Sequence, residues 1–370
     1  MQPEPHDRPA PAARPAGRFE RWLRRAWWLH SFFALGFGVF VMLFARKGLA
    51  YADKLLMILP ISWLLLFVAL RFIVGPANTA PDERMAKRGL RVVTNYIIKN
   101  LYQQMFFFLV PLYAASATWS LTSRNFWLPP LLFACAILST LDVVFDHFIM
   151  GRRLLASAMY GVCLFGVLNL MLPMVFGLTH LHALLIAAAA TAPAIALLSF
   201  RVGTVLAPRG LGLTLAATAV LTGAAWLGRA AVPPAPLALV EGAVGHGVAG
   251  SYEGLPGKKL YIRETQIDGL RCGTLASEPG GIHDDLVHVW RHRGDLIARV
   301  PVRPVDDDDP TTVLMRSSPE RIPPRPGGRW TCSLETADGQ LVGVVPFTVL
   351  AADTRIPSEP VQVPASDGGR

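Results

Sequence analysis

The polarity of this chain changes abruptly near Ala235, and this break constrains the fold more than any other feature. Before the break, long apolar stretches follow one another with short connections. After it, apolar and polar residues alternate between turns rich in Gly, Pro and Asp. The first pattern is typical of membrane-spanning helices and the second of short β-strands. The sequence therefore predicts a membrane-embedded helical region that carries one folded β-domain.

The charge of the chain divides at the same place. Residues 1–235 hold 21 Lys and Arg against 8 Asp and Glu, whereas residues 236–370 hold 14 against 18. Only 16% of the whole chain is charged, compared with about 25% in soluble domains, and this favours a membrane protein. We attribute the basic surplus to loops beside anionic lipid rather than to nucleic acid, so the lipid bilayer is an expected partner.

Seven apolar stretches are long enough to cross the hydrocarbon core, which takes about 20 residues of helix. They lie at residues 26–45, 55–74, 100–118, 126–145, 154–178, 182–200 and 211–228. The third begins among polar side chains and the sixth is rich in Ala, so six spans is the competing count. The sequence predicts an all-α transmembrane domain of about seven helices at residues 26–230, after a disordered cytoplasmic segment at residues 1–25.

The distribution of Lys and Arg predicts the orientation of these spans. With the N-terminus in the cytoplasm, the cytoplasmic segments carry 15 of these residues and the opposite segments carry five. Trp119, Trp127 and Trp226 fall at the predicted outer boundaries, where interfacial Trp is common. The bias and an odd number of spans together place the C-terminal domain outside the cytoplasm.

Polar side chains gather at the cytoplasmic ends of the third and fourth spans, namely Lys99, Gln103, Gln104, Asp142 and Asp146. A short outer loop joins the two spans, so we expect them to be antiparallel neighbours. An unpaired carboxylate near hydrocarbon is costly, and we therefore expect Lys99 to pair with Asp142 or Asp146. Such a group either locks two helices together or handles ions, and we favour the structural role.

Two groups of histidines are weighed as metal sites. Two histidines at positions 180 and 182 could bind a metal ion, although an interfacial role is favoured, whereas the second group lacks the spacing of a metal site. His180 and His182 fall on the outer loop between the fifth and sixth spans, where we expect interfacial side chains. The second group is expected at the surface of the β-domain and consists of His283, Asp284, Asp285, His288 and His292. The acidic run Asp306–Asp309 is expected to be a solvated turn, because it lacks the ligand spacing of a calcium loop. No metal or cofactor is predicted.

Strand signals recur at short spacing in the C-terminal part. They lie at residues 260–266, 269–276, 286–290, 295–302, 311–317, 329–336 and 341–350. Seven short strands without a helical period predict an all-β, immunoglobulin-like sandwich at residues 259–352. We expect a linker at residues 231–258 before this domain and a disordered tail at residues 353–370 after it.

Two cysteines fall on strands of the predicted β-domain. Cys272 lies on the second predicted strand and Cys332 on the sixth. If both side chains point inward, they could form a disulfide between the sheets, which an oxidising compartment permits. The alternative is a pair of buried thiols. The candidate core residues of the domain are Trp290, Trp330, Leu334 and Phe347.

The chain contains no G-x-S-x-G, P-loop or H-E-x-x-H sequence, so we expect no catalytic residue and a protein that is not an enzyme. The segments VHVWRHRGDLIARVPV (287–302) and GGRWTCSLETADGQLVGVVPFTV (327–349) resemble the domain of unknown function DUF2914. The upstream segments YQQMFFFLVPLYAASATW (102–119) and STLDVVFDH (139–147) are similar to the multi-span region that accompanies it in uncharacterised bacterial membrane proteins. The resemblance implies a bacterial inner-membrane location and no assigned activity.

The leading hypothesis is a non-enzymatic inner-membrane protein whose periplasmic β-sandwich binds a protein or an envelope polymer. The alternative is a transporter or ion-handling component that uses Lys99, Asp142 and Asp146. A third hypothesis is an intramembrane enzyme that acts on lipid, and it would need polar groups that converge at one face of the membrane.

Overall fold

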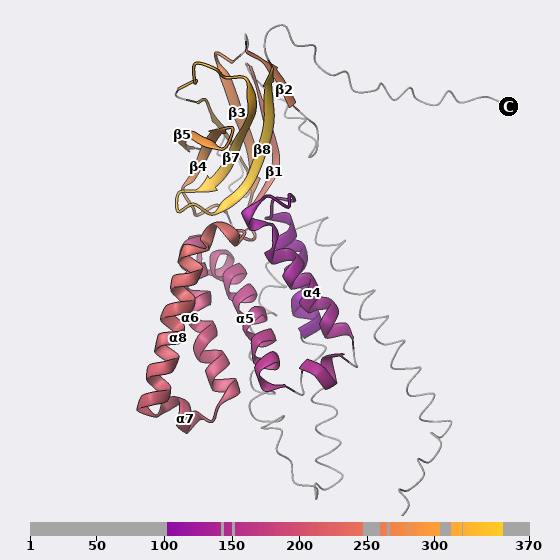
Figure 1. Ribbon diagram of the computed structural model, residues 1–370, viewed down its shortest axis with the longest axis vertical. Coiled ribbons are helices and arrows are strands. Elements are labelled where there is room, and N and C mark those ends of the chain that lie inside the picture. Colours follow the sequence, from indigo (N-terminus) through magenta and orange to yellow (C-terminus); the bar gives the residue numbers. More distant parts are fainter. Residues whose placement is uncertain are drawn as a thin grey trace, which may run out of the picture.

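The computed structural model describes residues 102–141, 144–149, 152–246, 260–264, 267–279, 281–303, 312–319 and 321–350. Helices come first along the chain, and the β-strands that follow form a separate body at one end of the helices (Figure 1). The predicted division of the chain near Ala235 is therefore present in the structure. The expected spans at residues 26–45 and 55–74, the expected tail and Asp306–Asp309 lie outside the described residues.

The helical region contains three helices that are long and apolar enough to cross a membrane, and they occupy the positions expected of the last three spans. Its elements are a helix over residues 102–115, η3 (Arg124–Phe126), α4 (Leu128–Thr140), the π-helical η4 (Val144–Ile149), α5 (Arg153–Phe176), α6 (His180–Ser199), α7 (Val202–Leu206), α8 (Pro208–Leu227) and η5 (Arg229–Ala231). The three long helices are α5, α6 and α8. The described residues do not support about seven spans, since α4 has only 13 residues where a span of 20 was expected.

The turn between α5 and α6 is set by Gly177, which has a φ of 59°. This left-handed conformation suits glycine, and the Gly177 N–H donates to Pro173 O and so ends α5. Because only two residues follow before α6 begins, the two helices pack side by side. The helix over residues 102–115 also approaches α5 closely, since a Cβ at Gly166 would lie 2.9 Å from Cδ1 of Leu109.

The β-domain consists of two sheets. Its strands are β1 (Ala238–His246), β2 (Leu260–Arg263), β3 (Leu270–Ser277), β4 (Leu286–His292), β5 (Asp295–Val302), β6 (Thr312–Ser317), β7 (Gly328–Thr336) and β8 (Leu341–Leu350). The smaller sheet has the order β1-β3-β6 and the larger β2-β8-β7-β4-β5, in which β2 runs parallel to β8. All seven expected strands are present. β1 is additional and lies inside the expected linker at residues 231–258, so the predicted boundary of the domain is corrected towards the N-terminus.

The two sheets pack face to face through alternate residues of each strand. In β7, Trp330, Cys332, Leu334 and Thr336 are buried, and the first three belong to apolar clusters with side chains of the smaller sheet. Trp290, Trp330, Leu334 and Phe347, the expected core, are almost completely buried. Burial of this apolar surface is the main favourable term in folding of the domain.

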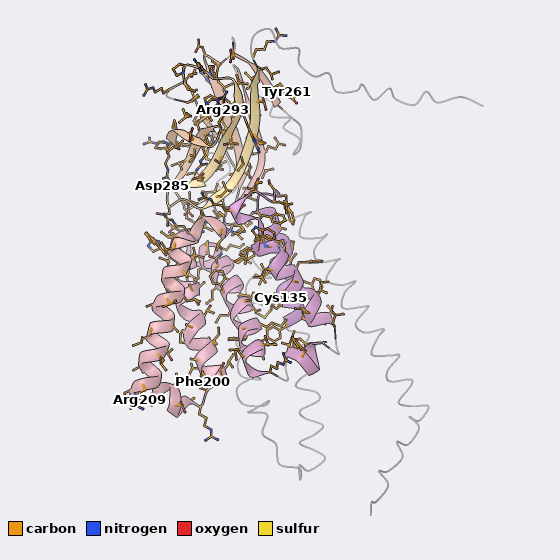
Figure 2. The ribbon with its side chains drawn as sticks, in the orientation of Figure 1. Cys135, Phe200, Arg209, Tyr261, Asp285 and Arg293 are labelled. Carbon is orange, nitrogen blue, oxygen red and sulfur yellow. A yellow bond between two sulfur atoms is a disulfide. The ribbon has the colours of Figure 1, made fainter. Side chains whose placement is uncertain are left out.

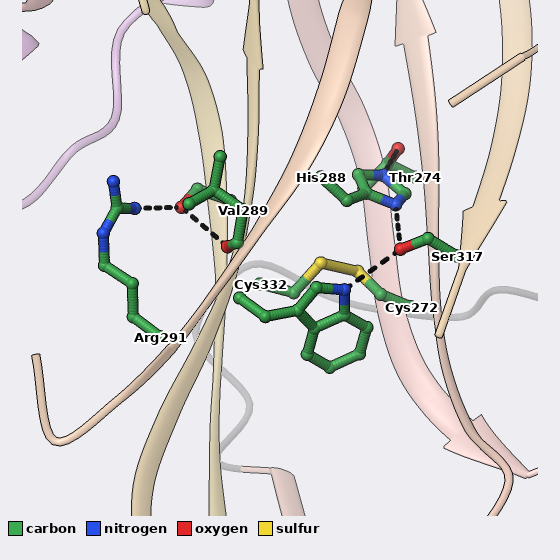
Figure 3. Close-up of a disulfide and its surroundings, with 9 residues drawn as sticks. Cys272, Thr274, His288, Val289, Arg291, Ser317 and Cys332 are labelled. Carbon is green, nitrogen blue, oxygen red and sulfur yellow. Dashed lines mark hydrogen bonds between the residues drawn. A yellow bond between two sulfur atoms is a disulfide. The ribbon is translucent and has the colours of Figure 1, made fainter. Parts of the chain in front are cut away.

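A disulfide joins the two sheets. It links Cys272 on β3 to Cys332 on β7, with Cα atoms 6.6 Å apart (Figure 3). Trp290 pairs with Cys332 across the β4–β7 ladder and belongs to the same apolar cluster as both cysteines. The bridge closes a separation of 60 residues, and a restraint of this kind lowers the entropy of the unfolded chain.

Candidate functional site at the junction of the two regions

The β-domain is fastened to the helices at three separate points. Asn125 in η3 donates from Nδ2 to Leu341 O at the start of β8, at 2.9 Å. Arg229 in η5 donates from Nε to Asp338 O in the β7–β8 turn. The third point is the N-terminus of α6, where His180 meets the segment between β3 and β4. Contacts at three elements hold the domain in one orientation.

The contact at His180 is the most unusual of the three, because it consists of ionisable side chains that are shielded from water. His180 Nδ1 donates to Oδ2 of Asp284 at 2.6 Å, and His180 Nε2 lies 3.4 Å from Oε1 of Glu278. The backbone N–H of His180 also points to both carboxylate oxygens of Asp284, at 3.2 Å each. All three side chains are no more than 2% exposed. We call Glu278, His180 and Asp284 the junction triad.

The two carboxylates of the junction triad differ in their surroundings. Asp284 accepts hydrogen bonds from the ring and the backbone of His180, at the N-terminus of α6, where a negative charge is favourable. Glu278 has the single contact to His180, and its Oε2 has no hydrogen-bond partner among the described residues. Burial raises the pKa of Glu278 to about 7; the charge of His180 opposes this rise and that of Asp284 adds to it.

These positions overturn two expectations from the sequence. His180 was expected at the membrane interface, yet it is buried, since it is the first residue of α6 and the β-domain covers it. Asp284 was expected at the surface, yet its side chain is also enclosed. His182 is exposed as expected, and its Nδ1 hydrogen-bonds with Thr179 Oγ1 at 2.6 Å. The sequence contains an outer-loop histidine and, far along the chain, acids near strand ends. Nothing in the sequence pairs them, because only the tertiary structure brings them together.

A second buried polar group lies between the sheets, beside the disulfide (Figure 3). His288 on β4 hydrogen-bonds through Nε2 with Thr274 Oγ1 and through Nδ1 with Ser317 Oγ, both at 2.8 Å. Trp290 Nε1 donates to the same Ser317 oxygen at 3.1 Å. Burial lowers the pKa of His288 to about 4. His288 was expected at the surface and so was His292; both expectations are wrong, because their strand face points into the core.

Neither group is arranged to hold a metal ion. In the junction triad, the two carboxylates contact opposite nitrogens of the His180 ring, so one ion could not bind all three side chains. The sulfurs of Cys272 and Cys332 lie within 4.8 Å of a ring nitrogen of His288. However, a thiolate is the form of Cys that binds metals, and these sulfurs are bonded to each other.

The expected polar group of the third and fourth spans is described only in part. Lys99 and Asp142 lie outside the described residues, as does the side chain of Asp146. Gln103 is buried, and its Nε2 donates to Ser139 O of α4 at 3.0 Å. This bond joins the two helices that were expected to be neighbours.

A further polar pair lies inside the helical region. Asn169 Nδ2 donates to Tyr113 Oη at 2.9 Å, and Tyr113 Oη donates to Gly166 O at 3.0 Å. Asn169 stands out in the sequence as a strongly polar residue near the centre of a span, but its partner Tyr113 does not.

The described chain is thus a protein with helices long and apolar enough to cross a membrane and a C-terminal β-sheet domain fastened to one end of them. Residues 12–270 match the family of unknown function DUF5924, and the chain belongs to this family. Residues 283–349 match the protein of unknown function DUF2914, which confirms the resemblance drawn from the sequence. No curated protein and no solved structure matches the chain.

The two matches cover different strands of the β-domain, and β3 lies almost entirely between them. β1 and β2 fall within the DUF5924 match, whereas β4 to β8 fall within the DUF2914 match. β1 nevertheless pairs with β3, and β2 pairs with β8. The DUF2914 segment of this chain therefore completes both sheets only with strands supplied from outside it.

Proposed function

We propose that this protein is a non-enzymatic integral protein of the bacterial inner membrane that presents its β-domain in the periplasm. There the domain binds a protein or an envelope polymer. The observation that carries the proposal is the fastening of the β-domain at three points on one end of the helices. A domain held in this way is displayed at a fixed height and orientation above the membrane.

Side chains at the two ends of the helices support this orientation. Trp119, Trp127 and Trp226 are exposed near the β-domain, as Trp is at membrane interfaces, and Arg229 lies over the Trp226 ring. Arg209 and Phe200 both lie at the opposite end of the helices (Figure 2). Basic residues at that end favour its placement in the cytoplasm.

The strand order supports an immunoglobulin-like sandwich. In such a domain two sheets carry a disulfide between them, and a buried Trp on a neighbouring strand packs against it. Cys272 and Cys332 form the bridge here, and Trp290 is the buried Trp. Domains of this architecture serve many functions, so the architecture supports binding without naming the partner.

Charge at the far end of the β-domain favours an anionic polymer as the partner. This end contains the β4–β5 turn with Arg293, which donates from Nη2 to Gly327 O and so lies against the loop before β7 (Figure 2). Among the described residues, the exposed acids at this end are Asp268 and Asp295, and Glu264 is half-buried. They are outnumbered by the exposed arginines Arg263, Arg271, Arg293, Arg321, Arg325 and Arg329. A basic surface of this kind attracts polyanions in a salt-dependent manner.

The binding proposal is tested with the full-length protein in nanodiscs of neutral lipid. The probes are dextran sulfate and uncharged dextran of the same length. We expect dextran sulfate to bind, and binding to weaken about tenfold or more when Arg293, Arg325 and Arg329 are replaced by Gln. The control variant carries Arg201→Gln and Arg209→Gln at the other end of the helices. Equal binding by both variants, or binding of neither polymer by the wild type, would contradict an anionic polymer as partner.

The orientation has its own test. Ser318→Cys places a thiol at the far end of the β-domain, and Val202→Cys places one at the opposite end of the helices. A thiol reagent that does not cross membranes should label Cys at position 318 in intact cells and reach position 202 only after lysis. The reverse pattern would overturn the periplasmic placement. The ion-handling alternative stays a prediction, because the side chains of Lys99, Asp142 and Asp146 lie outside the described residues.

A further inference from the structure

We propose that the junction triad is a proton-binding site, and that a proton on Glu278 strengthens the attachment of the β-domain to the helices. The proposal concerns the junction alone and does not depend on the partner or on the orientation in the membrane. Nothing in the matched families assigns a role to these residues.

The junction triad carries more negative than positive charge when it is fully ionised. Two carboxylates face one imidazole, and all three side chains are shielded from water. Even if His180 is cationic, the fully ionised group carries one excess negative charge. A buried charge without a partner is strongly destabilising, and a group in this position usually takes up a proton. One proton makes the triad neutral.

The two carboxylates of the junction triad are not equally suited to take the proton. Asp284 receives three N–H contacts from His180, and these hydrogen bonds stabilise its anion. Glu278 lies at the longer distance of 3.4 Å from the ring, and its Oε2 has no partner among the described residues. An oxygen that receives no hydrogen bond is poorly stabilised as an anion, so the proton belongs on Glu278.

Other charged groups near the triad are directed elsewhere. On the β3–β4 segment, Asp285 is exposed (Figure 2). His283 is also exposed, and its ring lies against Gly177 at the end of α5. On α6, His182 is exposed and bonded to Thr179. On η5, Arg229 donates to Asp338 O and Trp226 O. Among the described residues, none of these side chains forms an ion pair with Glu278.

The direction of the effect follows from linkage. The pKa of Glu278 is about 7 in the docked structure and near 4.5 when the side chain is in water. The docked state therefore binds the proton more tightly than the undocked state. The added stability is fully present below about pH 4.5 and is lost as the pH rises through 7. The β-domain should be held most firmly at acidic pH.

The test is hydrogen exchange of the full-length protein in nanodiscs between pH 5 and pH 8.5, expressed as protection factors to remove the intrinsic effect of pH. In the wild type, protection at residues 278–285 and 180–183 should fall about tenfold or more from the acidic to the basic end. Glu278→Gln, which resembles the protonated acid, should lose much less protection over the same range. Glu241→Gln, on the exposed side of β1, is the matched control and should behave as the wild type.

Two results would overturn the proposal. One is the same pH dependence in Glu278→Gln and the wild type. The other comes from infrared spectra of the wild type alone, which do not depend on whether a variant folds. A buried carboxylic acid should lose its C=O stretching band near pH 7, whereas ordinary carboxyl groups titrate near pH 4. The absence of any carboxyl group that titrates between about pH 6 and 8 would exclude a proton on Glu278.

Discussion

The helical region and the β-domain direct their apolar side chains in opposite ways. In α8, apolar side chains such as Leu213 and Val220 point outward, and none of its residues is buried. In β7, by contrast, apolar side chains point inward in strict alternation. The helical region places its polar pair, Asn169 and Tyr113, in the interior. The difference fits helices that are long and apolar enough to cross a membrane and a β-domain whose apolar side chains form an interior core.

The comparison also predicts where stability is concentrated. Loss of apolar packing should be most costly in the β-domain, where water drives burial. In a membrane, lipid is as apolar as the helix surfaces, so packing and hydrogen bonds between helices contribute smaller amounts. Four variants can sharpen or break this contrast, from the largest expected effect to the smallest.

Trp290→Ala should destabilise the β-domain by about 3–5 kcal/mol, because it removes a large side chain from the centre of the core and leaves a cavity. Pulse proteolysis of the full-length protein in urea would measure the free energy of unfolding of the domain. Trp127→Ala, at an exposed Trp of the helical region, serves as control and should change this free energy little. Similar losses in both variants would break the contrast.

Replacement of both Cys272 and Cys332 by Ala should cost about 2–4 kcal/mol, since the unfolded chain gains freedom when the bridge is absent. The same measurement applies, under oxidising conditions. The free thiol Cys135 on α4 offers a matched control, because Cys135→Ala removes a sulfur without a bridge. A double variant as stable as the wild type would show that the bridge does not restrain the unfolded chain.

His288 should make the β-domain sensitive to acid. Its pKa of about 4 in the folded domain lies below the value of 6.5 in water, so its contribution to stability is present above pH 6.5 and is lost as the pH falls through 4. The loss should approach about 3 kcal/mol. Urea unfolding at several pH values in a Glu278→Gln background measures it without the opposite effect of Glu278. His288→Gln should flatten the curve, and an unchanged curve would exclude His288 as the cause.

Tyr113→Phe should cost the helical region about 1 kcal/mol or less, because hydrogen bonds between membrane helices contribute little more than that. Reversible unfolding in mixed micelles, followed by helical circular dichroism, would measure this. Tyr261→Phe in β2 is the control, because it removes a phenolic hydroxyl group outside the helices. A cost above that of Trp290→Ala would reverse the comparison between the two regions.

Much of the β-domain could be predicted from the sequence. Alternation of apolar residues marked seven strands, and it also indicated that Trp330, Cys332 and Leu334 share a face. β1 was missed because its sequence, ALVEGAVGH, contains two Gly, is preceded by prolines and lacks a clear alternation. Its strand is formed by pairing with β3, which is a contact between distant residues.

The histidines show the limit of such reasoning most clearly. His288 follows the strand alternation that places Trp290 in the core, yet a polar side chain was expected at the surface. It is buried because Thr274 and Ser317, on two strands of the opposite sheet, satisfy both ring nitrogens. Partners of this kind are separated from it by 14 and 29 residues, and no local pattern reports them.

The sequence by itself determined the division near Ala235, the apolar stretches of α5, α6 and α8, and the strands of the β-domain. These depend on the local spacing of apolar side chains, which has a different period in helices and in strands. Only the tertiary structure decided that His180, Glu278 and Asp284 meet. Their contact requires the β3–β4 segment to dock on the N-terminus of α6, and His180 and Asp284 are 104 residues apart in the sequence. The free energy of that docking depends on both regions being folded, so no local pattern reports it.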